Sequence, residues 1–202
     1  MKPAVTKLCI AFAITITLAL NATGQVNYGM YINAGKSKLQ QHGDEFANQF
    51  YWSSAHSIDF FVREGLRNSS ISLQQGVVLG NYSTLVTLPE DMRDTGEEPF
   101  EWTDRIYYAG IPIGINYHPE KWFTLNFGFV NNFKLKSEND SKSTKNYVLR
   151  TYTGFEFTIF KKVLLGCQYS YSLTPDHQWI YKPDKTNHNY HVISGKVGYL
   201  FR

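Results

Sequence analysis

The sequence predicts an all-β fold: an eight-stranded antiparallel up-and-down transmembrane β-barrel, preceded by a cleaved signal peptide. Three observations lead to this prediction. Eight segments alternate between apolar and polar residues, their connections alternate between long and short, and the strand glycines gather opposite the large apolar side chains. The composition agrees, because 16% of the 202 residues are aromatic and 18% are charged, and flat or branched side chains favour a pleated surface.

The eight segments show the two-residue period of β-strands, and none shows a convincing helical period. The expected strands are residues 26–35, 57–66, 71–82, 105–118, 122–134, 147–159, 163–173 and 189–201. Pro112 lies within the fourth of them and has no N–H to donate to a neighbouring strand. We therefore expect a bulge or a local break in strand pairing at Pro112.

Residues 1–24 have the pattern of a secretory signal peptide. Lys2 and Lys7 accompany the apolar run 8–20, and small residues precede Gln25 as a cleavage site. An N-terminal anchor helix is the alternative, although the apolar run is short for a membrane span. Residues 25–202 are then the outer-membrane β-barrel domain.

Removal of the leader changes the charge and cysteine content. The formal net charge falls from +3 to +1, because Lys2 and Lys7 are lost and no acidic residue precedes Gln25. No basic patch suggests nucleic acid as a partner. Cys167 is then the only cysteine, so no intramolecular disulfide is expected.

The connections between the expected strands segregate by length. The long ones are residues 36–56, 83–104, 136–145 and 174–188, and the short ones are 67–70, 119–121 and 161–162. Successive connections in an up-and-down barrel lie at opposite ends, and outer-membrane barrels keep their short turns in the periplasm. The pattern predicts a bacterial outer-membrane location with long external loops and both termini in the periplasm.

The two faces of the expected strands differ in side-chain size. The glycines on the less apolar face are Gly29, Gly35, Gly65, Gly76, Gly80, Gly110, Gly114, Gly128, Gly154, Gly166 and Gly198, and Gly195 alone lies on the other face. The interior of an eight-stranded barrel is barely wide enough for side chains. The glycines are therefore predicted to face the lumen and the bulky residues to face lipid.

Aromatic residues are expected near both rims. Tyr117, Phe123, Phe157, Tyr199 and Phe201 fall near the periplasmic rim, and Tyr107, Tyr147 and Tyr171 fall nearer the other. Two such girdles are typical of membrane barrels at the interfaces. Ordinary aromatic enrichment of strands is the alternative.

The predicted lumen face also carries charges: Asp59, Arg63, Arg150, Glu156 and Lys196. Buried charges persist when they are paired and hydrogen-bonded. We favour a salt-bridge network that plugs a narrow barrel. An ion path or gate is the alternative.

Several stretches resemble a known family. "YYAGIPIGINY" (107–117) followed by "WFTLNFGFVNNF" (122–133) resembles the central hairpin of small outer-membrane β-barrel proteins of the PorT-like type, common in Bacteroidota, which tend to carry Ile-Pro at this place. "TYTGFEFTIFKKVLLGCQYSYSLTP" (151–175) resembles the hairpin that such proteins place before the last strand, and "GKVGYLF" (195–201) resembles their final strand. The resemblance covers about half the chain and leaves residues 36–104 unmatched. It implies the barrel architecture and, for some members, a role in protein secretion, and it carries over no catalytic or binding residues.

The closing strand also resembles the C-terminal signal that barrel-assembly machinery recognises. Lys196, Gly198, Tyr199 and Phe201 match its pattern of a polar residue, glycine and aromatics, although Arg202 stands where a final aromatic is commoner. The partners this implies are the barrel-assembly machinery and outer-membrane lipid.

Residues suited to catalysis or metal binding form no convincing pattern. His177, His188 and His191 cluster near the last long loop without the further ligands that a metal site needs, so solvated loop histidines are expected. His56, Ser57 and Asp59 are neighbours along one strand and cannot form a catalytic relay. A lipid-modifying enzyme at the outer rim is the alternative for the His and Ser. The acidic loop with Asp91, Asp94, Glu97, Glu98 and Glu101 could bind divalent cations or a partner, but an ordinary solvated loop is expected.

The sequence thus predicts a monomeric, non-enzymatic envelope protein without metal or cofactor. Its lumen is plugged and polar, and its long loops are available for adhesion or for secretion-accessory contacts with a protein partner. Two alternatives stay open: a narrow channel for ions or small solutes, and a soluble exported β-barrel that binds an apolar ligand with its faces inverted.

Overall fold

The computed structural model describes residues 26–42, 49–66, 69–87, 101–138, 146–175, 177–180 and 185–201. The predicted signal peptide, residues 1–24, lies outside these described residues. Within them, no helix is long and apolar enough to cross a membrane.

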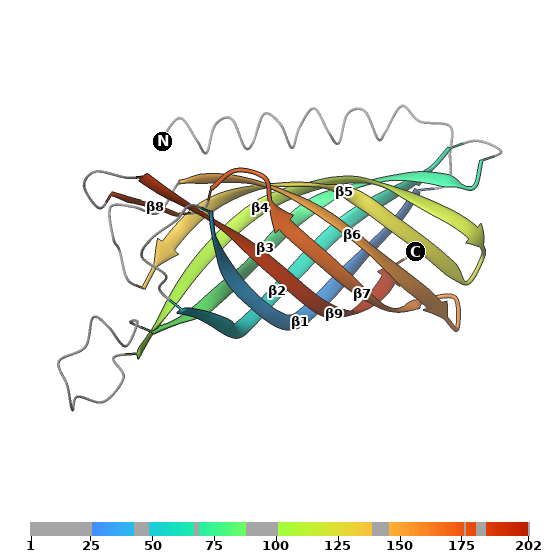
Figure 1. Ribbon diagram of the computed structural model, residues 1–202. Coiled ribbons are helices and arrows are strands. Elements are labelled where there is room, and N and C mark those ends of the chain that lie inside the picture. Colours follow the sequence, from blue (N-terminus) through green and yellow to red (C-terminus); the bar gives the residue numbers. More distant parts are fainter. Residues whose placement is uncertain are drawn as a thin grey trace.

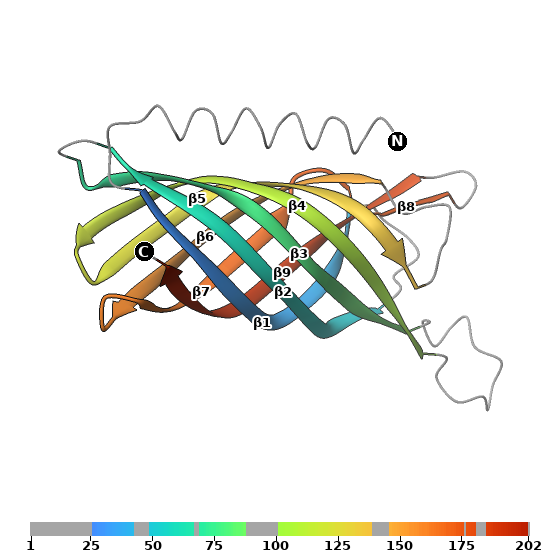
Figure 2. The same cartoon turned by 180° about the vertical axis from the view of Figure 1, so that it is seen from behind.

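The described chain is one closed antiparallel barrel (Figures 1 and 2). Its strands are β1 (Val26–His42), β2 (Gln49–Gly65), β3 (Ile71–Thr87), β4 (Glu101–Glu120), β5 (Phe123–Ser137), β6 (Tyr147–Ile159), β7 (Val163–Ser172), β8 (His177–Ile180) and β9 (Lys185–Phe201). Neighbours in sequence pair from β1 to β7, β9 follows β7, and β9 closes on β1 with Tyr28 opposite Phe201. The predicted eight-stranded up-and-down barrel is confirmed.

The ninth strand, β8, is an addition that the sequence pattern did not predict. It pairs only with the start of β9, from His177 opposite His188 to Ile180 opposite Lys185. It therefore extends the last long connection as a hairpin at the rim, where Figure 1 shows it beyond the ends of the other strands.

The strands reach further toward the long loops than predicted. The first was expected to end at 35 and the second to begin at 57, but β1 runs to His42 and β2 starts at Gln49. The prediction was wrong because the apolar face changes sides there. Beyond Ala34 the exposed positions of β1 are Lys36 and Gln40, and the buried one between them with a large apolar side chain is Leu39.

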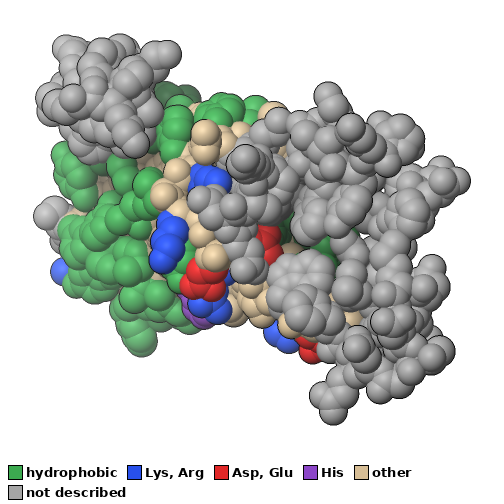
Figure 3. All heavy atoms as spheres, turned by 90° about the vertical axis from the view of Figure 1, so that its left-hand side faces the viewer, with side chains coloured by type: hydrophobic (Ala, Val, Ile, Leu, Met, Phe, Trp, Pro, Cys, Tyr) green, Lys and Arg blue, Asp and Glu red, His purple; other side chains and the backbone are tan. Residues whose placement is uncertain are grey.

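The wall therefore has two zones. In the zone nearer the short turns, large apolar side chains are exposed on the outside; they include Tyr28, Ile32, Ile58, Phe60, Leu73, Leu79, Ile113, Ile115, Phe127, Phe129, Phe155, Leu165, Ile193 and Val197. In the zone nearer the long loops, Tyr51, Trp52, Leu135 and Tyr147 are still exposed. Other apolar side chains of this zone turn inward and pack together as a cluster of Leu39, Phe50, Ala55, Tyr82, Val86, Ile106 and Tyr190. We call this cluster the upper core. Figure 3 views the barrel from the long-loop end and shows hydrophobic side chains on the outer wall beside a separate group of charged ones.

The strand lengths fit this division. A strand of 17 residues such as β1 is roughly 56 Å long at about 3.3 Å per residue. Tilted by about 40°, it spans roughly 40 Å along the barrel axis, whereas the apolar band of an outer-membrane barrel is about 25 Å tall. The barrel wall consequently continues well past its apolar band.

Pro112 interrupts strand pairing on one side only. The β3–β4 ladder pairs Gln75 with Ile113 and next Val78 with Gly110, so the residues between are not paired. On the other side Pro112 lies opposite Val130 in an unbroken stretch. The local break expected at this proline is confirmed.

Gly114 and Gly195 illustrate the two faces. A Cβ added to Gly114 would overlap the Tyr152 hydroxyl and lie 2.6 Å from the carbonyl oxygen of Phe127, whereas one added to Gly195 would approach only the Ala34 carbonyl oxygen, at 3.9 Å.

Gly114→Ala should lower the free energy of unfolding by about 1–3 kcal/mol through overpacking. Gly195→Ala should change it by about 0.5 kcal/mol or less. Urea titrations of the two refolded variants, followed by tryptophan fluorescence, measure both values; equal losses would contradict the assignment of faces.

Candidate functional site in the lumen

Glu156 lies in the lumen, toward the short-turn end of β6, and is fully buried. It extends from β6 and forms two ion pairs with cations from other strands. Arg63 Nη1 on β2 lies 2.7 Å from Glu156 Oε1, and Lys196 Nζ on β9 lies 3.2 Å from Oε2. One carboxylate thus serves two buried cations across the barrel.

Uncharged side chains complete the hydrogen bonding of this network. The Tyr31 hydroxyl donates to Glu156 Oε2 at 2.6 Å and accepts from Arg63 Nη2 at 2.7 Å. Arg63 also donates to Gln74 Oε1 through Nε at 3.3 Å and Nη2 at 2.9 Å. Lys196 donates to Asn126 Oδ1 at 2.7 Å. Hydrogen bonds of this kind allow charged groups to remain in a low-dielectric interior.

Apolar side chains close the lumen beside the network. The rings of Tyr31 and Phe61 stack with centroids 4.5 Å apart, and both pack with the fully buried Leu164 and with Leu200. We call these four residues the lower core. Arg63 lies over the Phe61 ring at 5.2 Å and Lys196 over the Tyr31 ring at 4.8 Å. The lower core and the ion pairs therefore form one packed layer.

The other two predicted lumen charges do not join these ion pairs. Asp59 accepts hydrogen bonds from Ser57 Oγ and Asn33 Nδ2, both at 2.9 Å. Arg150 donates from Nε to Ser172 Oγ at 3.2 Å, and its guanidinium lies 4.1 Å from the centroid of the Tyr82 ring. Of the five predicted residues, the structure brings together Arg63, Glu156 and Lys196.

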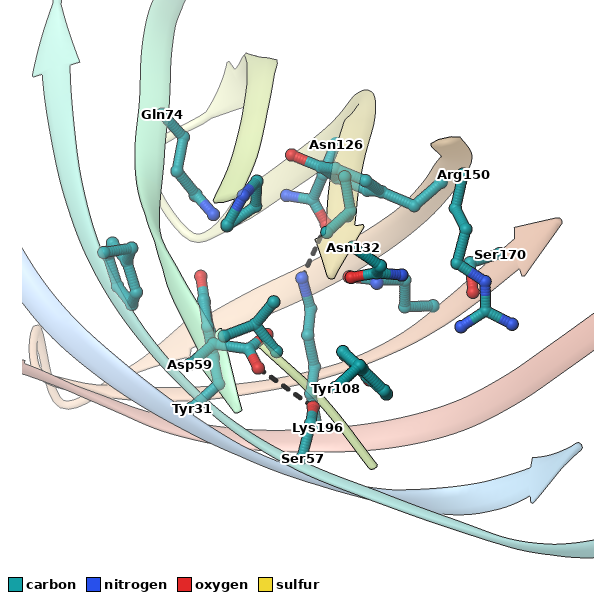
Figure 4. A pocket seen from close by; sticks show the side chains of 16 residues that line it. Tyr31, Ser57, Asp59, Gln74, Tyr108, Asn126, Asn132, Arg150, Ser170 and Lys196 are labelled. Atoms are coloured by element: carbon teal, nitrogen blue, oxygen red, sulfur yellow. Dashed lines mark hydrogen bonds between the residues drawn. The ribbon is translucent and has the colours of Figure 1, made fainter. Parts of the chain in front are cut away.

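A polar cavity of about 50 Å³ lies in the lumen. Its lining includes Asp59, Lys196, Arg150, Tyr108 and Tyr152. Figure 4 shows Asp59 and Tyr31 on one side of it, Arg150 and Ser170 on the other, and Lys196 between them. A second cavity of about 40 Å³ shares Arg150 and Tyr108 with the first.

The candidate residues for other chemistry are dispersed. Ser57 and Asp59 are hydrogen-bonded to each other, but His56, which precedes Ser57, is exposed. His188 is buried and packs against the Phe50 ring, whereas His191 hydrogen-bonds Tyr169 and Gln40 at partly exposed positions. Among the described residues no group of three or more His, Cys, Asp or Glu could hold a metal ion.

Some predicted positions lie outside the described residues. These are the His177 side chain and, in the acidic loop, Asp91, Asp94, Glu97 and Glu98; Glu101 begins β4 and is exposed.

The C-terminal residues occupy both faces of β9. Lys196 and Gly198 are buried in the lumen, while Tyr199 and Phe201 are 41% and 42% exposed.

The uncharged partners of the network, Tyr31, Gln74 and Asn126, were not predicted from the sequence. Each occupies a lumen-facing position in the alternation of its strand, and that position was the available signal. Nothing in the local sequence identifies which charged group each would contact, because the partners lie on other strands.

No protein-family model matches the sequence, and no curated protein matches it either. Among solved structures, the chain is similar to Neisserial surface protein A, with 12% identity, a TM-score of 0.51, and coverage of 88% of this chain and 99% of that one. It is also similar to the outer membrane protein OprG from Pseudomonas aeruginosa (11% identity, TM-score 0.48, 90% and 100% covered) and to Ail of Yersinia pestis (14% identity, TM-score 0.44, 88% and 99% covered). The likeness to Neisserial surface protein A supports the barrel fold alone, and the PorT-like resemblance stays a prediction.

The network predicts an unequal response to removal of its members. Glu156→Gln leaves Arg63 and Lys196 buried without their carboxylate and should cost about 3–5 kcal/mol in the free energy of unfolding. Lys196→Met should cost less, because Glu156 keeps Arg63. The double variant should cost less than the sum of the two, since Lys196 no longer needs a partner.

Urea unfolding of the three variants measures this coupling, with Lys36→Met as the control for loss of an exposed lysine. Additive losses, or a Glu156→Gln cost equal to that of Lys36→Met, would show that the ion pairs do not hold the lumen together.

Proposed function

We propose that this protein is a non-enzymatic integral protein of a bacterial outer membrane, with a plugged lumen and both termini in the periplasm. The observation that carries the proposal is the direction of the side chains. Large apolar residues cover the outside of the zone nearer the short turns, while the inside holds charges and amides. So large an exposed apolar surface marks contact with lipid or with another protein, and a closed barrel satisfies its backbone within a bilayer.

The rim near the short turns supports this placement. Tyr117, Tyr199 and Phe201 are exposed there, and the Trp122 ring stacks on Phe157 with centroids 5.8 Å apart. Tryptophan and tyrosine at the end of an apolar band are typical of a membrane–water interface. The short turns would then lie in the periplasm and the long loops outside the cell.

The lumen supports a plug. The lower core closes it near the short turns and the upper core fills it near the long loops, with cavities of about 50 and 40 Å³ among the described residues. Polar cavities of this size offer no room for an apolar ligand, which argues against the soluble alternative.

The external part is the proposed site of contact with partners. The strands run past the apolar band with exposed polar residues such as Lys36 and Gln40. A rigid extension of this kind would hold the long loops away from the lipid surface. Envelope structure, adhesion and secretion-accessory contacts all suit such a display, and the last of these is also what the PorT-like resemblance implies.

Fractionation and gel mobility test the proposal directly. The protein should stay in the outer-membrane pellet after high-salt and carbonate washes. An unheated sample should migrate differently from a boiled one on an SDS gel, because a closed barrel resists unfolding by the detergent. Recovery in the soluble fraction, or the absence of a mobility shift, would contradict a membrane barrel.

A conductance measurement distinguishes a plugged lumen from the alternative of a narrow channel. The two polar cavities are the observation that favours the channel. Planar bilayers containing the protein should stay silent. Conductance steps that disappear in Arg150→Gln would show that the lumen is a narrow channel and not plugged. They would not contradict the membrane location.

We also propose that Lys196, Gly198, Tyr199 and Phe201 act as the assembly signal. Phe201→Ala should reduce the amount of heat-modifiable barrel in the outer membrane several-fold. Tyr28→Ala is the matched control, since Tyr28 lies opposite Phe201 on β1 and is 48% exposed. Equal losses of heat-modifiable barrel in the two variants would show that the pairing of β1 with β9 matters and not a signal at Phe201. Unchanged assembly of the Phe201 variant would contradict the signal role.

A further inference from the structure

Arg150 is a buried cation without a carboxylate. Its exposed fraction is 3%, and it forms no ion pair with any residue that the structure describes. Its Nε donates to Ser172, but its Nη2 has no hydrogen-bond partner. The Tyr82 ring face offsets part of the desolvation of the guanidinium, yet a buried charge normally has a counter-charge as well as hydrogen bonds.

The two acids that the sequence places in the lumen are already engaged. Glu156 pairs with Arg63 and Lys196. Both oxygens of Asp59 accept hydrogen bonds, Oδ1 from Ser57 and Oδ2 from Asn33. Figure 4 shows Asp59 on the opposite side of the cavity from Arg150. The walls of this cavity therefore contain two cations, Arg150 and Lys196, and one carboxylate.

The cavity also presents a hydroxyl without a partner, and the Asn132 Oδ1 that lines it has none either. Tyr152, which is 5% exposed, has an unpartnered hydroxyl and lines the same cavity as Arg150. Ser170 and Gln168 line both cavities beside Arg150. A volume of about 50 Å³ exceeds what one water-sized particle requires.

We propose that Arg150 is the anchor of a buried binding site for a small inorganic anion of the size of chloride. The anion would accept a hydrogen bond from Arg150 Nη2 and supply the negative charge that the cavity walls lack. An organic anion the size of gluconate would not fit in this volume. The site differs from the Glu156 ion pairs and does not depend on the orientation of the barrel or on a loop partner.

The folded barrel should therefore be stabilised by chloride. At constant ionic strength, replacing gluconate so that chloride rises from 10 to 300 mM should lower the unfolding equilibrium constant roughly eightfold for a dissociation constant of about 30 mM. Arg150→Gln should abolish this dependence. Arg105→Gln is the matched control, because Arg105 pairs with Glu138 at an exposed position, and it should keep the dependence.

The outcomes decide the proposal. Identical stability in chloride and gluconate, or an Arg150→Gln variant that retains the chloride effect, would overturn it. If Arg150→Gln does not fold, crystals of the unaltered protein soaked in bromide provide the second measurement. An anomalous peak within hydrogen-bond distance of Arg150 Nη2 would support the site, and no peak at saturating bromide would overturn it.

Discussion

A carboxylate buried in a narrow lumen needs cations and donors around it, and Glu156 obtains them from three other strands. Tyr31 comes from β1, Arg63 from β2 and Lys196 from β9. Because successive strand residues face opposite sides, a one-residue slip of any of these strands would turn its polar group to the outer wall. The ion pairs thus fix the register of half the barrel. The rings of the lower core pack directly on them.

The wall joins two different solvation patterns in the same strands. Near the short turns most large apolar side chains face out, and near the long loops a larger share of them turns inward to form the upper core. The second pattern is that of a water-soluble barrel with its own hydrophobic interior. The protein therefore combines a segment suited to lipid with a segment suited to water without changing its topology, and the height at which the pattern reverses marks one edge of the apolar band.

Much of the architecture was predictable because it depends on local alternation. The strand count, the antiparallel order and the inward placement of glycines such as Gly114 follow from side-chain period and size. The strand ends near the long loops did not follow, because Lys36 and Gln40 replace the outward apolar residues of β1, so its apolar face does not continue unchanged. β8 was missed since it is only four residues long and pairs with a single strand.

The residues that line the lumen could be predicted from the sequence, but the pairs that their side chains form could be predicted less well. Alternation places Asp59, Arg63, Arg150, Glu156 and Lys196 inside, but their heights along the barrel depend on the stagger between strands. That stagger brings Glu156 to Arg63 and Lys196, and it leaves Asp59 to two neutral donors and Arg150 to a tyrosine ring.

The pairing of β1 with β9 makes assembly an all-or-none event along the chain. Tyr28 and Phe201 stand near opposite ends of the described residues yet face each other in the closed wall. The first strand therefore keeps an open hydrogen-bonding edge until the final strand has been delivered, and such an edge is prone to wrong pairing. Contacts so distant in sequence also make folding slow. A chain that ends before β9 has no strand with which β1 can pair to close the barrel.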